Sequence, residues 1–482
     1  MEAKFVRVGS VEDVRKMGVV VIHDADRPIA VFAHDGTISA CDNRCPHLGF
    51  PLDKGTVKDG ILTCHWHQAR FDMCSGCTFD LWADDVPSYE TRIEDGVVYV
   101  SATARLKADS ANYLKRLQKG MDQNIGLLQA KSLIGLLNLG IGPIDVTREI
   151  ARYAVRNQDA PGGITELAIA GSIQGALSQE TTYHLLLRGA RRIAETARNS
   201  KRQIRERLTG DSYNFETLKD WFYKWVQGRD REGSERVLLT AIESGCEHSQ
   251  LADMIFGAIS NRVYTDQGHT FDFANKAFEL LDLIGWKHAA DLLPLALPGI
   301  VSSRGAEELA SWHHPVEIIE PLLAAERELP RILSDGKGKS WRDDGTLVSI
   351  LLGDDPLKII DAMKAALSSG APPAEISKRV AYAAAMRLAR FAKANEVGDW
   401  FNPQHTYSFA NAVHQAIKRS PTPDVVRASF HAALSVYMDR FLNIPAAKLP
   451  GEGKGLDNLP TDAKALRELL LLGNHAKNPP RL

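Results

Sequence analysis

The chain has 482 residues, of which 44% are hydrophobic and 24% are charged, and its formal net charge is −2. This length allows about two to four globular domains, and the balanced charge offers no basic excess for binding nucleic acid. The first residues lack the apolar segment of a signal peptide, and no apolar run approaches the roughly 20 residues of a membrane span, so we expect a cytoplasmic protein that binds neither nucleic acid nor membrane.

The N-terminal part of the chain has the pattern of a small antiparallel β-domain. Short apolar runs occur at Val19–Ile22, Ile29–Phe32 and Val97–Val100, and each has the length of a strand. Three dipeptides that favour tight hairpins stand between such runs, namely Asp35-Gly36, Asp59-Gly60 and Asp95-Gly96. We therefore predict an all-β domain over residues 1–104.

Cysteines and histidines cluster inside this β-domain. In a long chain without a leader, such a cluster indicates a metal site rather than a disulfide scaffold. One segment is Cys45-Pro46-His47-Leu48-Gly49 and a second is Cys64-His65-Trp66-His67. In a Rieske centre two thiolates hold one iron and two histidines hold the other. A zinc site is the alternative, but zinc fingers usually keep their Cys and His pairs separate, whereas each segment here mixes the two types. The predicted ligands are Cys45, His47, Cys64 and His67.

These segments, together with Pro51-Leu52, Gly55 and Arg70-Phe71-Asp72, resemble Rieske ferredoxins and the Rieske domains of oxygenases over about the first fifth of the chain. The resemblance implies a [2Fe–2S] cluster that Phe50 and Trp66 shield and whose histidine edges lie near solvent. Respiratory Rieske proteins have an additional cysteine in each loop. Its absence here implies a reduction potential near the low end of the Rieske range, roughly −150 mV. Gln68 stands where glycine is frequent, so we expect slightly different loop packing there.

Beyond the β-domain the sequence predicts helices. Residues 105–112 are mostly small and polar and predict a linker. From residue 113 to residue 482 apolar residues recur at helical spacing, with glycine and proline between the segments. Predicted helices cover 145–156, 182–199, 218–226, 235–244, 249–260, 272–284, 315–328, 376–394 and 424–441. The fold class is therefore multidomain α+β, with a small all-β Rieske domain followed by a large all-α domain. This half is similar to the helical region of uncharacterised Rieske-domain proteins, which implies no established activity.

One motif occurs twice in the helical part. His269-Thr270-Phe271-Asp272-Phe273-Ala274-Asn275 parallels His405-Thr406-Tyr407-Ser408-Phe409-Ala410-Asn411, with five of seven positions identical. Such a repeat suggests an internal duplication that would place the two histidines in equivalent positions. His184 shares a predicted helical face with Glu180. We take His269, His405 and His184 as candidate catalytic residues, and the alternative is that they cap helices or are buried and hydrogen-bonded.

A simple electron carrier would need only the β-domain, so the helical region requires a further role. The two-histidine, one-carboxylate iron site of oxygenases is not recognisable, and neither is a glycine-rich or Walker nucleotide motif. The first hypothesis is an oxidoreductase in which a low-potential cluster receives electrons from a separate reductase or ferredoxin. It would pass them to a site in the helical domain that binds an unknown small-molecule substrate. In one form of this hypothesis, the site contains additional non-haem iron and carries out mono- or dioxygenase-like chemistry. The second is an electron-transfer protein whose helical half is a docking or oligomerisation scaffold, which allows a homo-oligomer, and the third is a redox sensor.

Overall fold

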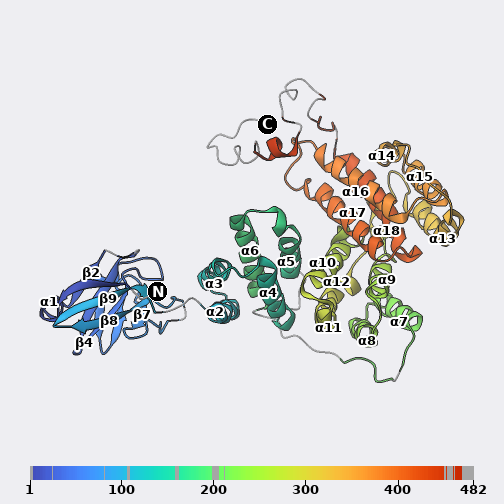
Figure 1. The fold of residues 1–482 in the computed structure, drawn as a ribbon. Coiled ribbons are helices and arrows are strands. Elements are labelled where there is room, and N and C mark those ends of the chain that lie inside the picture. Colours follow the sequence, from blue (N-terminus) through green and yellow to red (C-terminus); the bar gives the residue numbers. More distant parts are fainter. Residues whose placement is uncertain are drawn as a thin grey trace. The chain divides into compact units, whose positions relative to one another are not determined.

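The computed structural model describes residues 4–23, 25, 27–80, 82–105, 109–157, 162–197, 206–210, 212–443, 445–449, 452, 460 and 462–468. The chain forms two compact units (Figure 1). The first comprises Met1–Asp159 and Ile169–Lys201, and the second comprises Ala160–Ala168 and Arg202–Leu482. The division into residues 1–104, 105–112 and 113–482 stays a prediction.

The first unit begins with the predicted β-domain, drawn in blue in Figure 1. One antiparallel sheet has the strand order β1-β9-β8-β4-β3-β2, and a smaller sheet has the order β5-β6-β7. The strands are β1 (Phe5–Ser10), β2 (Val19–Ile22), β3 (Ile29–His34), β4 (Thr37–Asp42), β5 (Thr56–Lys58), β6 (Ile61–Thr63), β7 (Arg70–Asp72), β8 (Ser88–Glu94) and β9 (Val97–Ala104), and a short helix α1 (Val11–Met17) follows β1.

All three predicted hairpin turns are confirmed. They join β3 to β4, β5 to β6 and β8 to β9. At each turn the aspartate has a φ between 45° and 51° and the glycine has a φ between 73° and 77°. Two successive left-handed residues are the signature of the hairpin turn whose twist matches that of the strands, and Asp-Gly tolerates it well.

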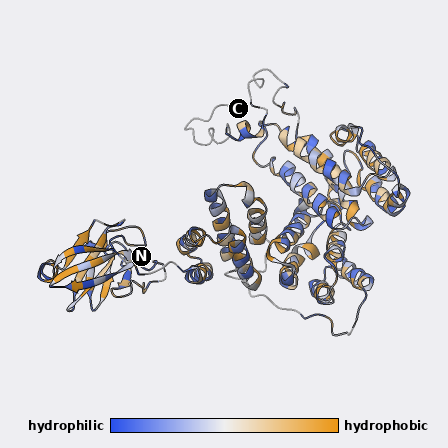
Figure 2. Ribbon diagram, viewed as in Figure 1, coloured by the Kyte–Doolittle hydropathy of each residue, from blue (hydrophilic) through white to orange (hydrophobic). Residues whose placement is uncertain are grey.

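Strand β3 has apolar residues at consecutive positions, rather than at alternate ones, because both of its faces are buried. Ala30 and Phe32 pack into the hydrophobic cluster that also holds the cysteines Cys45 and Cys64. Ile29 and Val31 point to the opposite side and pack into a second cluster. Because successive side chains in a strand point to opposite faces, a strand buried on both faces needs apolar residues throughout. Figure 2 shows this hydrophobic colouring in the strands of the domain.

Beyond β9 the described residues contain helices and no strand, as the periodicity predicts. The helices are α2 (Ser110–Asp122), α3 (Gly126–Asn138), α4 (Pro143–Asn157), α5 (Gly162–Ile173), α6 (Gln179–Ala197), α7 (Phe215–Gln227), α8 (Arg231–Glu243), α9 (His248–Ile259), α10 (His269–Ile284), α11 (Ala289–Leu292), α12 (Leu297–Ser302), α13 (Ile319–Gly336), α14 (Thr346–Leu351), α15 (Pro356–Ser368), α16 (Pro373–Ala389), α17 (Phe401–Arg419) and α18 (Pro423–Met438). Within the described ranges, none of these helices combines the length and the apolar character that a bilayer crossing requires.

Two helices differ clearly from the prediction: the one expected over 315–328 is α13 (Ile319–Gly336), and the one expected to end at residue 394 is α16, which ends at Ala389. The helix expected to begin at Pro315 begins at Ile319. The side chain of Glu317 accepts hydrogen bonds from the backbone N–H groups of Ile319 (2.8 Å) and Glu320 (3.2 Å). A carboxylate in this position satisfies the first free amides of a helix and interacts favourably with its dipole, so Glu317 marks the start of α13.

In the second unit, the two helices that contain the repeated motif pack side by side and run parallel. His269 lies beside His405 near their N-terminal ends, and Asp282 forms an ion pair with Arg419 near their C-terminal ends. Gly268 precedes α10 with a φ of +87°, and a Cβ atom at this position would lie 2.5 Å from Cβ of Phe409. The close approach of the helices therefore requires glycine here. The duplication itself stays a prediction.

Candidate functional site

The two cysteine–histidine segments form loops with the same backbone hydrogen bonds. The first follows β4, and the second joins β6 to β7. In each loop, the N–H group four residues after the cysteine donates to the carbonyl oxygen of that cysteine. The distance is 2.7 Å from Gly49 to Cys45 and 3.0 Å from Gln68 to Cys64. The loops are thus a matched pair that presents one cysteine and one histidine each.

The backbone at Gln68 is left-handed, as it is at Gly49, the residue four positions after the cysteine in the first loop. Gly49 has a φ of +85° and Gln68 a φ of +62°, both in the left-handed region. Left-handed backbone is uncommon for residues other than glycine. Glutamine nevertheless adopts it here, and the slightly different loop packing expected at Gln68 stays a prediction.

The four predicted ligands lie together in two like pairs. Cys45 and Cys64 are buried in the β-domain core. Burial, together with the hydrogen bond with Cys64, raises the pKa of the Cys45 thiol to about 11, while the backbone N–H of His47 acts in the opposite direction. The rings of His47 and His67 lie nearer the surface, with their centroids 4.7 Å apart and their planes perpendicular.

This arrangement fits a Rieske [2Fe–2S] cluster. Adjacent thiols suit one iron and adjacent imidazoles suit the other. The Nδ1 atom of His47 is buried and has no hydrogen-bond partner among the described residues. A buried polar atom normally has a partner, and an iron at this position would supply one. Cluster binding would also displace the thiol protons, because thiolate is the form that binds metal.

Aromatic side chains surround the histidines. Trp66 packs on Phe50 with ring centroids 5.2 Å apart and lies 5.7 Å from His67, as the resemblance implies for shielding residues. Trp66 is 59% exposed, however, so it covers the site only in part. A third aromatic residue, Trp82, lies 4.7 Å from the ring of His47. Sequence reasoning missed Trp82, because it lies in a loop well beyond the second ligand segment.

Helices α2 and α3 of the first unit contribute two cations beside the cluster loop. Lys131 on α3 donates hydrogen bonds to the carbonyl oxygens of Pro46 and His47, over 2.8 Å in the latter case. Arg116 on α2 forms an ion pair with Asp84, and Asp84 lies 3.4 Å from the Lys131 ammonium group. No local pattern signals these contacts, because they join residues between 32 and 85 positions apart in the chain.

We predict that Lys131→Met lowers the reduction potential of the cluster. Reduction adds a negative charge, which the nearby ammonium group stabilises. Loss of an interaction on the order of 1 kcal/mol corresponds to about 40 mV for a one-electron couple. Potentiometric titration of the full chain measures the change, with Lys115→Met on the exposed face of α2 as the control. An unchanged or higher potential in Lys131→Met would contradict this role.

The repeated motif brings two of the three candidate catalytic histidines together. The rings of His269 and His405 have centroids 4.3 Å apart and planes at 62°. Nδ1 of His269 lies 2.8 Å from the carbonyl oxygen of Asp266. Nδ1 of His405 is buried without a hydrogen-bond partner among the described residues. Burial lowers the pKa of His405, and the neighbouring His269 lowers it further.

The third candidate, His184, belongs to the first unit. It lies on α6, its side chain is 63% exposed, and its Nε2 atom is 3.9 Å from the carboxylate of Glu180. The shared helical face is therefore as expected, but the contact is that of an exposed pair, which contributes little to stability. A catalytic role for His184 stays a prediction.

The helical region does not offer the ligand set of a mononuclear iron site. In the part of the chain that the structure describes, no three side chains of His, Cys, Asp or Glu are grouped so that they could hold one metal ion. The pair of His269 and His405 supplies two imidazoles, whereas the facial triad also needs a carboxylate. The additional non-haem iron expected from the sequence stays a prediction.

Comparison with known proteins concerns the β-domain. Residues 4–90 match the Rieske [2Fe-2S] domain family. The chain is 29% identical over 98 residues to the ferredoxin component of the naphthalene 1,2-dioxygenase/salicylate 5-hydroxylase systems of Ralstonia sp, which is 20% of this chain and 92% of that protein. It is 31% identical over 77 residues to the 3-phenylpropionate/cinnamic acid dioxygenase ferredoxin subunit of Photorhabdus laumondii subsp. laumondii, covering 16% of this chain and 73% of that subunit.

A larger relative shares only this part. The chain is 36% identical over 70 residues to human apoptosis-inducing factor 3, which is 14% of this chain and only 12% of that protein. These matches leave the helical region unassigned. The loop geometry, the paired ligands and the similarity to ferredoxin components together establish a Rieske-type [2Fe–2S] electron-transfer domain. Through this N-terminal domain, the chain belongs to the Rieske [2Fe–2S] family of the ferredoxin type.

Proposed function

We propose that this chain is an oxidoreductase in which the Rieske cluster passes electrons to a substrate site in the helical region. A separate reductase or ferredoxin supplies the electrons, and a small molecule that binds beside His269 and His405 receives them. A cluster of this type transfers one electron at a time. Reduction of an organic group by two electrons therefore uses two cycles of the cluster and two protons.

The observation that carries this proposal is the histidine pair. The two histidines are 136 residues apart in the sequence, yet their rings lie 4.3 Å apart near the N-terminal ends of α10 and α17. The lowered pKa of His405 favours a neutral imidazole at neutral pH. A neutral imidazole with a free nitrogen can accept a proton or transfer one. Because the described residues supply no third ligand, iron-dependent oxygen chemistry is not part of this proposal.

The test compares the wild type with a His269→Ala/His405→Ala double variant, both as the full chain. Anaerobic iron and acid-labile sulfide analysis first establishes that both contain the cluster. We then expect the chemically reduced cluster of the double variant to be reoxidised at least about tenfold more slowly, without O₂ and in the presence of a cell-derived small-molecule fraction, a barrier change of about 1.4 kcal/mol. Tyr407→Ala, an exposed aromatic residue beside His405 on α17, is the control.

A second function is an electron carrier whose helical half serves as a docking or oligomerisation scaffold. The printed names of two similar proteins support it, because both are ferredoxin components of dioxygenase systems. In this case the double variant keeps the reoxidation rate of the wild type. Equal rates would therefore contradict the first proposal and favour the carrier.

A further inference from the structure

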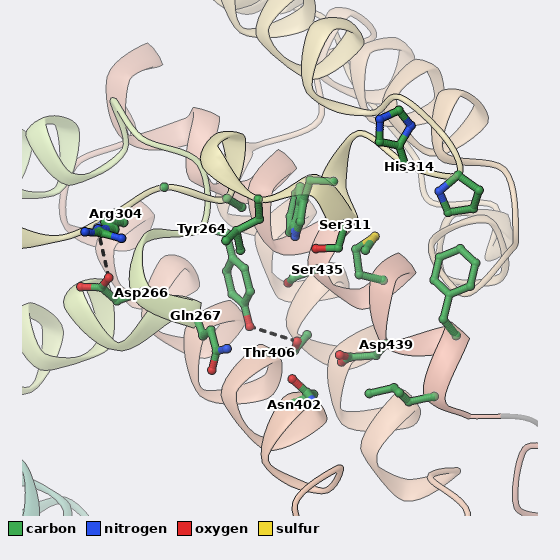
Figure 3. A pocket seen from close by; sticks show the side chains of 18 residues that line it. Tyr264, Asp266, Gln267, Arg304, Ser311, His314, Asn402, Thr406, Ser435 and Asp439 are labelled. Atoms are coloured by element: carbon green, nitrogen blue, oxygen red, sulfur yellow. Dashed lines mark hydrogen bonds between the residues drawn. The ribbon is translucent and has the colours of Figure 1, made fainter.

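A cavity of about 730 Å³ lies in the second unit, next to the segments that contain the histidine pair. Three parts of the chain form its wall, as Figure 3 shows. They are the segment before α10 at Tyr264, the stretch from Arg304 to Pro315, and the helices α17 and α18 with the turn after α18. This volume lies within the range of small-molecule sites.

The backbone on one side of the cavity is held in an uncommon conformation. Tyr264, Asp266 and Gln267 all have left-handed dihedral angles, with φ of 45°, 46° and 57°. Left-handed residues other than glycine are uncommon singly, and three within four positions need support from their surroundings. Asp266 supplies it, because its N–H donates to the carbonyl of Arg304 (3.0 Å) and its carboxylate accepts from the N–H of Arg304 (3.1 Å). Such over-determined backbone is typical of ligand sites.

A buried carboxyl group lines the opposite side. Asp439 follows α18 and is 5% exposed. Its Oδ2 atom accepts no hydrogen bond from the described residues. Burial raises the pKa of Asp439 to about 7, while the hydrogen bond with Thr406 and the charge of Arg387 act in the opposite direction. The hydroxyl groups of Thr406 and Tyr264 lie 3.4 Å apart, so a short row of polar groups leads from Tyr264 to Asp439.

The rest of the wall is mainly apolar. Trp312 is buried against the ring of Tyr264, with centroids 5.7 Å apart. Leu309, Phe441 and Leu442 also line the cavity, although they are 49%, 41% and 39% exposed. Large apolar side chains that remain partly exposed around a cavity are available for a ligand. The buried carboxyl group of Asp439 disfavours an anion beside it and can hydrogen-bond a hydroxyl or carbonyl group. The charged residues Arg304 and Asp266 line the cavity away from Asp439, beside Tyr264.

From this arrangement we infer that the cavity binds a neutral, largely apolar small molecule, whose hydroxyl or carbonyl group makes a hydrogen bond with Asp439. The apolar body of the ligand lies against Trp312, Leu309 and Leu442. This ligand is the electron acceptor of the proposed function, and that part of the inference rests on the proposed function. Binding itself needs no electron transfer, so each can fail without the other.

The test measures binding of two probes of the same shape to the full-length protein at neutral pH by calorimetry. The probe 4-phenylphenol is neutral, and 4-phenylbenzoate is an anion. We expect 4-phenylphenol to bind at one site per chain and at least about tenfold more tightly than 4-phenylbenzoate. Asp439→Asn removes the acid at nearly constant size and is expected to reduce this preference.

Two substitutions at exposed positions test the location without disturbing the core. Ser311→Trp places a large side chain in the cavity, and Leu442→Ser removes part of its apolar wall. Each is expected to weaken 4-phenylphenol binding at least about tenfold. Leu357→Ser, on α15 and 49% exposed, is the matched control and should bind as the wild type does.

Three results would each overturn the inference. They are the absence of saturable binding by either probe, tighter binding of 4-phenylbenzoate than of 4-phenylphenol, and unchanged binding in both Ser311→Trp and Leu442→Ser. Slow reoxidation in the histidine double variant together with any of these would leave the proposed function standing while placing its substrate elsewhere. Binding as expected, together with unchanged reoxidation in the histidine double variant, would support the ligand site and contradict the proposed function.

Discussion

Cys64→Ser is expected to yield a full-length protein that contains almost no iron or acid-labile sulfide, whereas the wild type contains two of each per chain, as a [2Fe–2S] cluster requires. Cys64 is 1% exposed, and the neighbouring Cys45 is 3% exposed. One iron depends on both thiolates, and a serine hydroxyl stays protonated at neutral pH and is a poor ligand. The visible absorption and the electron paramagnetic resonance signal of the reduced cluster should disappear with the iron.

The same domain offers matched controls for this prediction. Cys41 is buried in the same hydrophobic cluster, but it is not a ligand in either loop. Burial raises the pKa of the Cys41 thiol to about 12, so it behaves as a small apolar residue. Cys41→Ser should lower stability and retain the cluster, and Cys74→Ser, at an exposed position, should change neither. A full complement of iron in Cys64→Ser would show that the ligand assignment is wrong.

Asp439→Asn is expected to stabilise the protein relative to the wild type, and increasingly so as the pH rises. Burial raises the pKa of Asp439 from 3.8 to about 7. At a pH between these two values, the folded state therefore keeps a proton on Asp439 that the unfolded state has lost. The contribution of Asp439 to stability is therefore greatest below pH 4 and is lost as the pH rises towards 7. About three pKa units correspond to roughly 4 kcal/mol. Asparagine does not ionise, so it avoids this loss.

Urea unfolding of the wild type and the variant from acid to neutral pH measures this effect as a difference in the free energy of unfolding. Asp272, whose pKa burial raises to about 6, affects both proteins alike and cancels in that difference. Asp361→Asn, at an exposed position on α15, is the control substitution. A constant difference for Asp439→Asn would mean that the pKa of Asp439 is the same in the folded and in the unfolded protein.

Part of the helical site was accessible to sequence reasoning, and part was not. The repeat identified His269 and His405, because a duplicated unit tends to place equivalent residues in equivalent positions. The contact between their rings depends on the close packing of α10 and α17, which Gly268 permits. Nothing in the local sequence distinguishes Asp439 from an ordinary acid at the end of a helix. Its burial and raised pKa come from the side chains around it.

Sequence patterns alone are enough to predict the cluster ligands, and they account for the hairpins and the helical character of the second half. These features are local, because ligand spacing, Asp-Gly turns and apolar periodicity each act over a few residues. The folded chain was needed to show that Lys131 reaches the carbonyl of His47, that His269 lies beside His405, and that a cavity forms between Tyr264 and Asp439. These contacts join residues far apart in the chain, and they depend on side-chain packing between elements, which no short-range pattern specifies.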